Sequence, residues 1–443
     1  MRGDGTGQRS RPFAWLGRRA RPAGAGGARH PLDRAWLRKR LADCAAGAGG
    51  EASARNRVAE LATAYRALDD AGRSAFLESV AEEGRDGDVR ASAPLARTWL
   101  EATGVERQLA AGRLRAALAG APMRILKQFN LLPEGVKFLV DLRADAIRLG
   151  SGDDALRVVS DGLYALFEDW FALGNLELRR ITWQSPAALL ERLMAYEAVH
   201  EIRSWLDLRH RLESDRRCYA FFHPRMPQEP LVFVEVALTP EIATAIGPLL
   251  DEAAPAVDPR EATTAVFYSI SSTQPGLRGV PFGGFLIKRV VVDLVAEFPR
   301  LATFVTLSPA PGFRRWLEGR PGAAPPAHAA DATADATADA TADATTGAAL
   351  TALCARYLVT EKRNGRPLDP VARFHFSNGA RLDRVNWQAD TSPRGLAQSL
   401  GIMVNYRYEP AEIEDNHEAY SRDGRLAISN NVKRLLRKGP ETV

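Results

Sequence analysis

The chain has few cysteines and lacks the spacings that disulfide and metal sites require. Its 443 residues include three cysteines, Cys44, Cys218 and Cys354, which lie far apart and form no C-x-x-C pair. An odd, sparse set of this kind argues against a disulfide framework and against a zinc site. No H-x-x-x-H or HExxH cluster occurs either. We therefore expect no metal site and a reducing compartment.

Long apolar runs and a strong excess of one charge are also missing. No run of roughly 18 apolar residues is present, so we expect no membrane span. The net charge of +5 suits an anionic ligand but is too small to indicate nucleic acid. Residues 1–30 hold seven arginines and one Asp, a composition that resembles an organelle transit peptide. We favour a disordered tail and a cytoplasmic protein.

Length and pattern together indicate two domains. At roughly 100–200 residues per domain, a chain of 443 residues is long for one core. Residues 31–212 place apolar side chains at helical spacing and carry few strand signals, which predicts an all-helical domain. Residues 213–425 mix short β-rich segments with a helix, which predicts an α/β domain. Residues 426–443 are interpreted as a C-terminal tail.

A low-complexity insertion interrupts the second domain at residues 321–349. Its tract DATADATADATADATT repeats every four residues from Asp331 and contains no aromatic or large apolar side chain. Such a segment cannot bury a core. We therefore interpret it as a solvated loop rather than as a docking segment.

A glycine-rich turn between a predicted strand, 263–271, and a predicted helix, 284–297, is a candidate ligand site. Glycines let backbone amides approach a ligand, and a helix N-terminus presents unpaired N–H groups to an anion. A pyrophosphate would fit there, although a purely structural turn is equally compatible and the Walker pattern is absent. The candidate binding residues are Gln274, Gly276, Arg278, Gly279, Val280, Phe282, Gly283 and Gly284.

Candidate catalytic side chains follow from strand order and from histidine chemistry. Ser308 ends the next predicted strand, so it and the turn can face one site at the carboxyl edge of a parallel sheet. No G-x-S-x-G elbow surrounds it, which argues against an acyl-enzyme serine. Of the seven histidines, His223 and His375 are expected on strands of this domain. Spacing alone does not choose between them as a proton donor, and a structural role is the alternative for each.

Several long words of the sequence resemble the malonyl-CoA decarboxylase family. They occur in family order over residues 55–420 and include FYSISSTQPGLRGVPFGGFLIKRVV, TLSPAPGF and ARFHFSNGARLDRVNWQADTSPRGLAQSLGIMVNYRY. The resemblance implies a helical domain followed by an acetyltransferase-like (GNAT-like) α/β domain. It also implies a carboxy-lyase that turns malonyl-CoA into acetyl-CoA and CO2. The CoA belongs to the substrate, no other cofactor is expected, and the expected assembly is a homo-oligomer, a tetramer in relatives.

The resemblance further implies roles for three residues outside the turn. Ser308 takes the place of the family's catalytic serine, His375 that of its catalytic histidine, and Tyr408 that of a tyrosine near the site. Loss of CO2 leaves an electron pair that the thioester carbonyl takes up as an enolate. Ser308 is then expected to orient the carboxylate or the thioester oxygen, and His375 to protonate C2. Some relatives carry a glutamate where this chain has Pro281, so no acidic group is expected there to orient His375.

Two other functions stay open on the sequence alone. A CoA-dependent acyltransferase would use the same fold and turn, but it needs an acceptor pocket and no acceptor motif is visible. A non-catalytic acyl-CoA sensor would need only the turn, and retention of both Ser308 and His375 argues against it. Release of CO2 from malonyl-CoA without any acceptor distinguishes the decarboxylase from both.

Overall fold

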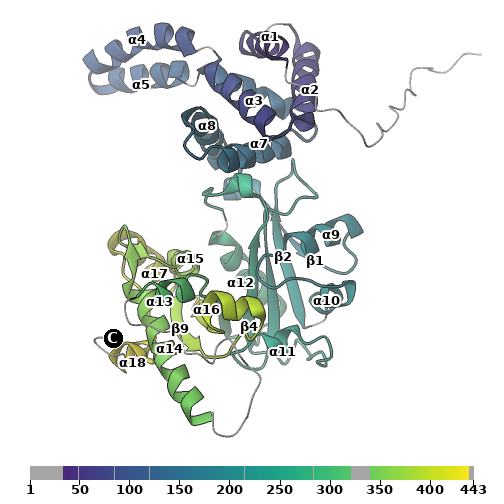
Figure 1. Ribbon diagram of the computed structural model, residues 1–443, viewed down its shortest axis with the longest axis vertical. Helices are drawn as coiled ribbons and strands as arrows, with labels where there is room; N and C mark the ends of the chain where they lie inside the picture. The colour runs from purple at the N-terminus through teal and green to yellow at the C-terminus, as the bar shows by residue number, and fades with distance from the viewer. Residues whose placement is uncertain are drawn as a thin grey trace, which may run out of the picture.

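The computed structural model describes residues 33–438, apart from residues 48, 84, 119, 214, 283 and 321–339. The Arg-rich tail, most of the repeat insertion and the candidate Gly283 therefore lie outside the described residues. Figure 1 shows a group of helices at one end of the molecule and a body built around a sheet at the other. A helical part followed by a mixed α/β part is the expected fold class. No helix in the described ranges is long and apolar enough to cross a membrane.

The N-terminal part is a bundle of helices whose buried faces carry residues such as Leu61, Phe76 and Phe167. Aspartates precede several of these helices, and Asp69 and Asp153 accept backbone N–H bonds as N-caps. The α4–α5 hairpin projects to the side of the other helices of the bundle (Figure 1). The helices are α1 (Arg34–Ala45), α2 (Glu51–Ala67), α3 (Asp70–Glu82), α4 (Arg85–Glu101), α5 (Gly104–Leu118), α6 (Gly120–Gln128), α7 (Gly135–Leu149) and α8 (Asp154–Trp170), with short 3-10 turns η1 (Phe129–Leu131) and η2 (Leu173–Asn175).

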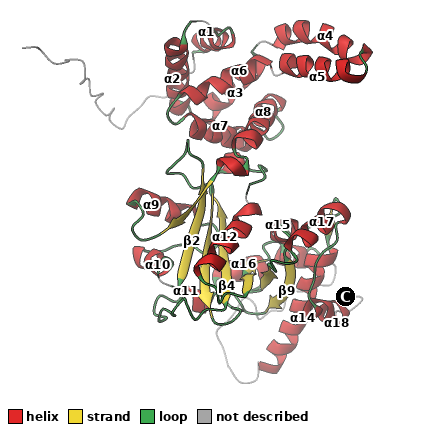
Figure 2. Cartoon of the chain, turned by 180° about the vertical axis from the view of Figure 1, so that it is seen from behind, coloured by secondary structure: helices red, strands yellow, loops and turns green. Residues whose placement is uncertain are grey.

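A mixed sheet forms the centre of the second part (Figure 2). Its strand order is β1-β2-β3-β4-β5-β10-β6, and β9 also pairs with β10. Strands β4 and β5 are parallel and are joined through η3 (Pro275–Leu277) and α12 (Gly284–Glu297), which confirms the expected strand–turn–helix–strand unit. The strands are β1 (Glu177–Ile181), β2 (Arg216–Phe222), β3 (Val232–Thr239), β4 (Thr264–Ser272), β5 (Thr303–Thr306), β6 (Ser308–Pro309), β9 (Arg381–Asn386) and β10 (Met403–Arg407).

The two faces of the sheet contribute to separate cores because neighbouring strand residues point to opposite sides. On one face, α9 (Ala187–Tyr196) and α10 (Trp205–His210) pack over Phe222. On the other, α12 packs through Leu286 into the core that contains Phe221, and this core continues into the helical bundle. The remaining elements are α11 (Gly247–Leu250), α13 (Phe313–Glu318), α14 (Ala340–Thr360), β7 (Lys362–Arg363), β8 (Arg366–Pro367), α15 (Pro370–Ser377), α16 (Pro393–Ser399), α17 (Ile413–Asp423) and α18 (Asn430–Lys438).

Three segments differ from the sequence-based expectation of helices up to residue 212, a loop over residues 321–349 and a tail after residue 425. Residues 340–349 of the expected loop already form the start of α14, since alanine is the strongest helix former. Strand β1 pairs with β2 along its whole length although three of its five residues are charged. Such a strand is stable at a sheet edge, where charged side chains reach water. At the other end, α18 buries Val432 and packs Leu435 and Leu436 against the main core. That spacing is the helical period, so the signal was present in the sequence.

The expectation that His375 lies on a strand is wrong. His375 lies in helix α15, whose N-cap Asp369 accepts the backbone N–H groups of Val371 and Ala372. The segment FHF resembles a strand because aromatic residues favour sheets. The Asp369–Pro370 pair decides the outcome, since aspartate at the N-cap and proline at the first helical position start a helix.

Candidate active site

Strands β4 and β5 separate at the carboxyl edge of the sheet and leave a cavity between them. They pair in parallel as far as Phe267 and Thr306, where the Leu307 N–H still donates to the Phe267 carbonyl (2.9 Å). Beyond this point a register shift against β3 marks a β-bulge at Tyr268, and the chain after β5 pairs with β10 instead of β4. The resulting cavity of about 220 Å³ is lined by Val199, Phe267, Tyr268, Ile270, Ser272, Ser308, Pro309, Pro370, Val371, Phe374 and His375.

Ser308, His375 and Tyr408 form one hydrogen-bonded chain at this cavity. The Ser308 Oγ lies 3.1 Å from His375 Nε2, and His375 Nδ1 lies 2.8 Å from the Tyr408 hydroxyl. The Ser308 hydroxyl also donates to Thr306 Oγ1 at 3.0 Å. Residues separated by up to 100 positions in sequence are thus brought together, and the three residues that the resemblance singled out share one site.

Burial keeps the His375 imidazole neutral when no ligand is present. The side chain is 1% exposed, and its burial lowers its pKa to about 3. Burial raises the pKa of Tyr408 well above its usual value, so its hydroxyl stays protonated. Because the Ser308 hydroxyl donates to Thr306, Nε2 is the donor to Ser308 and Nδ1 accepts a hydrogen bond from the Tyr408 hydroxyl. The ring proton of neutral His375 then belongs on Nε2, which faces Ser308. The cavity therefore presents an imidazole N–H beside a serine hydroxyl.

Three residues that the sequence analysis did not identify hold the imidazole in place. Tyr406 stacks on the ring with centroids 4.4 Å apart and planes inclined by 23°. Thr306 Oγ1 accepts hydrogen bonds from the Ser308 hydroxyl and from the Tyr406 backbone N–H (3.2 Å). Asp369 is fully buried and caps the helix that carries His375. Its carboxylate also accepts a hydrogen bond from the Tyr357 hydroxyl (3.2 Å). Tyr406 was detectable from the two-residue strand period, which places it on the same face as Tyr408.

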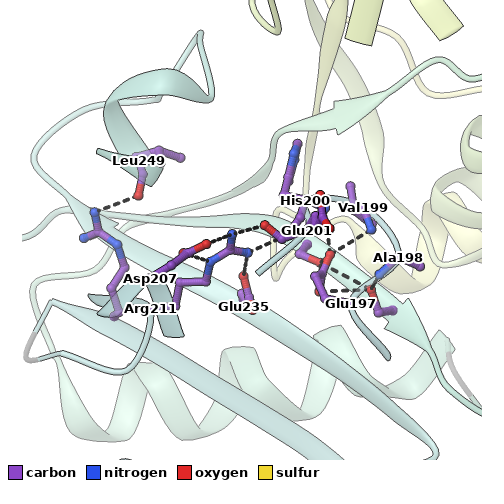
Figure 3. A network of polar contacts seen from close by, with 12 residues as sticks. Glu197, Ala198, Val199, His200, Glu201, Asp207, Arg211, Glu235 and Leu249 are labelled. Atoms are coloured by element: carbon purple, nitrogen blue, oxygen red, sulfur yellow. Dashed lines mark hydrogen bonds and ion pairs between the residues drawn. The ribbon is translucent and has the colours of Figure 1, made fainter. Parts of the chain in front are cut away.

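A buried polar network fixes the loop that forms one wall of the cavity (Figure 3). Glu197 Oε1 accepts the backbone N–H groups of Val199 and His200, each at 2.8 Å. From the other side Arg211 donates to the His200 carbonyl (2.8 Å) and to Glu235 (3.1 Å). Burial raises the pKa of Glu235 to about 8, although Arg211 opposes that shift. Because Val199 lines the cavity, this network sets the position of its wall.

The glycine-rich turn borders a second, larger cavity of about 750 Å³. Ser272 and Phe374 line both cavities, so the two adjoin. Gly276 does not line this space but packs on α7. Sequence reasoning missed Lys288 on its wall, which pairs with Glu414 at 2.7 Å. The predicted turn residues on its wall are Gln274, Arg278, Gly279, Val280, Phe282 and Gly284.

His223, the other candidate proton donor, lies outside both cavities. Its Nδ1 accepts the Arg225 backbone N–H (3.1 Å), and its ring packs on Phe171 with centroids 4.9 Å apart. Burial lowers its pKa. These contacts hold His223 against Phe171, whereas His375 is the histidine that lines the cavity with Ser308.

We expect the folded state to lose stability as the pH falls below 6.5, partly because of two buried histidines. Burial lowers the pKa of His375 to about 3 and that of His200 to about 4, while an unfolded histidine titrates near 6.5. Between these values the unfolded chain binds more protons, so each histidine costs up to about 1.4 kcal/mol per pH unit. Urea unfolding between pH 7.5 and 4.5 measures the slope. His375→Gln and His200→Gln should each flatten it, and an unchanged slope would contradict the assignment.

The chain is similar to proteins of one family. Residues 174–443 match the family model "Malonyl-CoA decarboxylase C-terminal domain", and residues 94–171 match the corresponding N-terminal domain. The mitochondrial malonyl-CoA decarboxylase of Anser anser anser is 36% identical over 419 residues, covering 86% of this chain and 83% of that protein. The mouse protein (Mus musculus) is 37% identical over 358 residues, 73% of each chain.

Solved structures of malonyl-CoA decarboxylases are similar to this chain over about nine tenths of its length. The malonyl-CoA decarboxylase of Agrobacterium vitis is 40% identical with a TM-score of 0.82, covering 90% of this chain and 99% of that one. That of Rhodopseudomonas palustris is 41% identical with a TM-score of 0.81, covering 91% and 100%. The chain belongs to the malonyl-CoA decarboxylase family.

Proposed function

We propose that this protein is a carboxy-lyase that converts malonyl-CoA into acetyl-CoA and CO2. The observation that carries the proposal is the pair of adjoining cavities, one bordered by the glycine-rich turn and the other by Ser308 and His375. A CoA ester fits this arrangement, with its pyrophosphate at the turn and its acyl group between the separated strands. Family membership supports the same substrate.

The small cavity suits the loss of a carboxylate. Its walls include the apolar side chains of Phe267, Ile270 and Val371. Ser308 can turn its hydroxyl from Thr306 toward a ligand, and His375 supplies an N–H. An apolar wall solvates a carboxylate poorly, and departure of neutral CO2 moves the negative charge to the thioester oxygen. Ser308 and the Nε2–H of His375 then lie beside the charge that develops. A positioned donor of this kind stabilises an oxyanion by about 3–4 kcal/mol.

His375 is also the proposed source of the proton for C2. It is neutral in the empty site, but a bound malonyl carboxylate favours its protonated form because opposite charges attract at short range. In the imidazolium, Nδ1–H donates to the Tyr408 oxygen, and Nε2–H faces the substrate. When CO2 has left, C2 takes the Nε2 proton and the imidazole is neutral again. The net reaction consumes one proton per CO2.

The test of the function is gas release without an acceptor. Purified protein with malonyl-CoA should release one CO2 for each acetyl-CoA formed, and added amines should not change the rate. An acyltransferase would instead need the amine, and a sensor would bind acetyl-CoA without turnover. Either result would replace the proposal. No cofactor beyond the CoA of the substrate is needed, because the thioester itself accepts the electrons.

Assembly and location remain predictions. We expect a homo-oligomer, a tetramer as the resemblance implies, and a cytoplasmic protein, with malonyl-CoA and acetyl-CoA as its small-molecule partners. Light scattering of the purified chain decides the first, and microscopy of the tagged protein decides the second.

The turn should recognise the part of CoA that substrate and product share. Gly279 has φ +90°, a conformation that costs other residues roughly 1–2 kcal/mol. In Gly279→Ala the free turn should relax out of this conformation, and binding must restore it at that cost. Acetyl-CoA and malonyl-CoA should therefore both bind roughly five- to thirtyfold more weakly. Calorimetric titration with both esters checks this. If only malonyl-CoA were weakened, the turn would belong to the acyl end and not to the pyrophosphate.

A further inference from the structure

The glycine-rich turn is held from outside its own domain, by helices α7 and α8 of the bundle. Arg143 on α7 is 6% exposed. Its Nη1 donates to the carbonyl oxygens of Gly276 (2.6 Å) and Arg278 (3.0 Å), and its Nε donates to the Ser160 carbonyl (3.1 Å). One guanidinium therefore ties two peptides of the turn to α8.

Neighbouring contacts show that the turn and the helices fit closely. The Arg143 guanidinium lies over the ring of Tyr164, 5.2 Å from its centroid, and the Tyr164 hydroxyl donates to the Gly279 carbonyl at 3.4 Å. A Cβ atom at Gly276 would lie 1.8 Å from the Val140 carbonyl oxygen. The glycine at 276 is thus required by the α7 backbone, and the turn rests directly on the helix.

The direction of one peptide links these contacts to the CoA cavity. In a trans peptide the N–H points opposite to the carbonyl, and the described chain contains no cis peptide. Because the Arg278 carbonyl points to Arg143 on α7, the Gly279 N–H points away from the helix. Gly279 lines the larger cavity, and its N–H finds no acceptor among the described residues. It is a free donor at the place proposed for the pyrophosphate.

We propose that Arg143 is a positioning residue of the CoA site, which orients the Arg278–Gly279 peptide so that the Gly279 N–H binds the CoA pyrophosphate. The proposal rests on the proposed function, because it takes the turn as the pyrophosphate site. It makes the N-terminal helices a part of the substrate site although Arg143 itself reaches no substrate. A guanidinium can orient the turn better than an ammonium, because its donors lie in a fixed plane. Nη1 binds the two turn carbonyls while Nε binds the Ser160 carbonyl.

The experiment compares full-length Arg143→Met and Arg143→Lys with wild type on two substrates. Malonyl-CoA carries the pyrophosphate, whereas malonyl-pantetheine lacks it. Arg143→Met should raise KM for malonyl-CoA and Kd for acetyl-CoA by about tenfold or more. Without the guanidinium the peptide no longer directs the Gly279 N–H at the charged pyrophosphate, and that hydrogen bond is lost. Its kcat should stay within about threefold of wild type, and its kcat/KM for malonyl-pantetheine should change little. Arg143→Lys should be intermediate, since its ammonium can reach one carbonyl.

Arg57→Met is the matched control, because Arg57 is a buried arginine of the same bundle on α2. It should lower the melting temperature without changing either KM. Equal losses on malonyl-CoA and malonyl-pantetheine, or a fall in kcat alone, would overturn the positioning role. If Arg143→Met does not fold, the same substrate ratio in Arg143→Lys decides. Wild type that binds acetyl-CoA but releases no CO2 would refute the function, while the acetyl-CoA affinities would still test Arg143.

Discussion

Replacing His375 with asparagine is expected to lower kcat by on the order of 10²–10⁴-fold and to leave acetyl-CoA binding nearly unchanged. Asparagine is similar in size and polarity, but it cannot act as a general acid near neutral pH. The imidazole lies at the small cavity, away from the turn that is proposed to bind the CoA pyrophosphate. The loss should therefore appear in the chemical step, which single-turnover kinetics and calorimetric binding measure separately.

His223→Asn is the control for this prediction, since it alters a histidine that contacts Phe171 and not the cavity. It should retain turnover close to wild type, with circular dichroism showing both variants to be folded. The opposite pattern, with turnover lost in His223→Asn and kept in His375→Asn, would move the proton donor to the boundary between sheet and helices. The proposed path of the proton would then be wrong.

Removing the Ser308 hydroxyl is expected to have the second largest effect. Ser308→Ala takes away one donor beside the developing oxyanion and should lower kcat by about 10²–10³-fold. If the hydroxyl binds the ground-state carboxylate, KM should rise and kcat should fall. If it binds only the thioester oxygen, kcat alone should fall, and steady-state kinetics distinguish the two.

The double variant Ser308→Ala/His375→Asn tests whether the two side chains act as a unit. Their atoms are in hydrogen-bond contact, so the combined loss should be smaller than the product of the single losses. If the fall in kcat of the double variant equalled the product of the two single falls, the serine and the histidine would contribute independently. Their hydrogen bond would then not couple them in catalysis.

Local patterns predicted the part of the site that lies on one continuous segment. The run from residue 263 to Ser308 alternates β-branched and aromatic residues, then glycines, then a helix, and a right-handed crossover of this kind permits few arrangements. The turn and Ser308 therefore fell at one sheet edge without further information. The β-bulge at Tyr268 was not predictable, because the sequence does not show which residue of a strand remains unpaired.

The sequence around His375 and around Arg143 does not indicate which distant residues they contact. His375 lies 67 residues beyond Ser308, on a helix of eight residues that resembles a strand in composition. Its place in the site entered the sequence analysis through family resemblance alone. Arg143 lies 133 residues before the carbonyl that it binds, and as one arginine among many on a helix it matches no motif. Only the packing of the bundle on the sheet brings it to the turn.

The bond from Arg143 to the turn also has a thermodynamic consequence. If docked helices raise the affinity of the turn for CoA, then bound CoA must strengthen the docking of the helices by the same free energy. Malonyl-CoA and acetyl-CoA share the groups that the turn is proposed to bind, so both would exert this effect throughout the catalytic cycle. The two halves of the chain would then be held together most firmly while a CoA ester is bound, and amide hydrogen exchange in α7 should slow as the ester concentration rises.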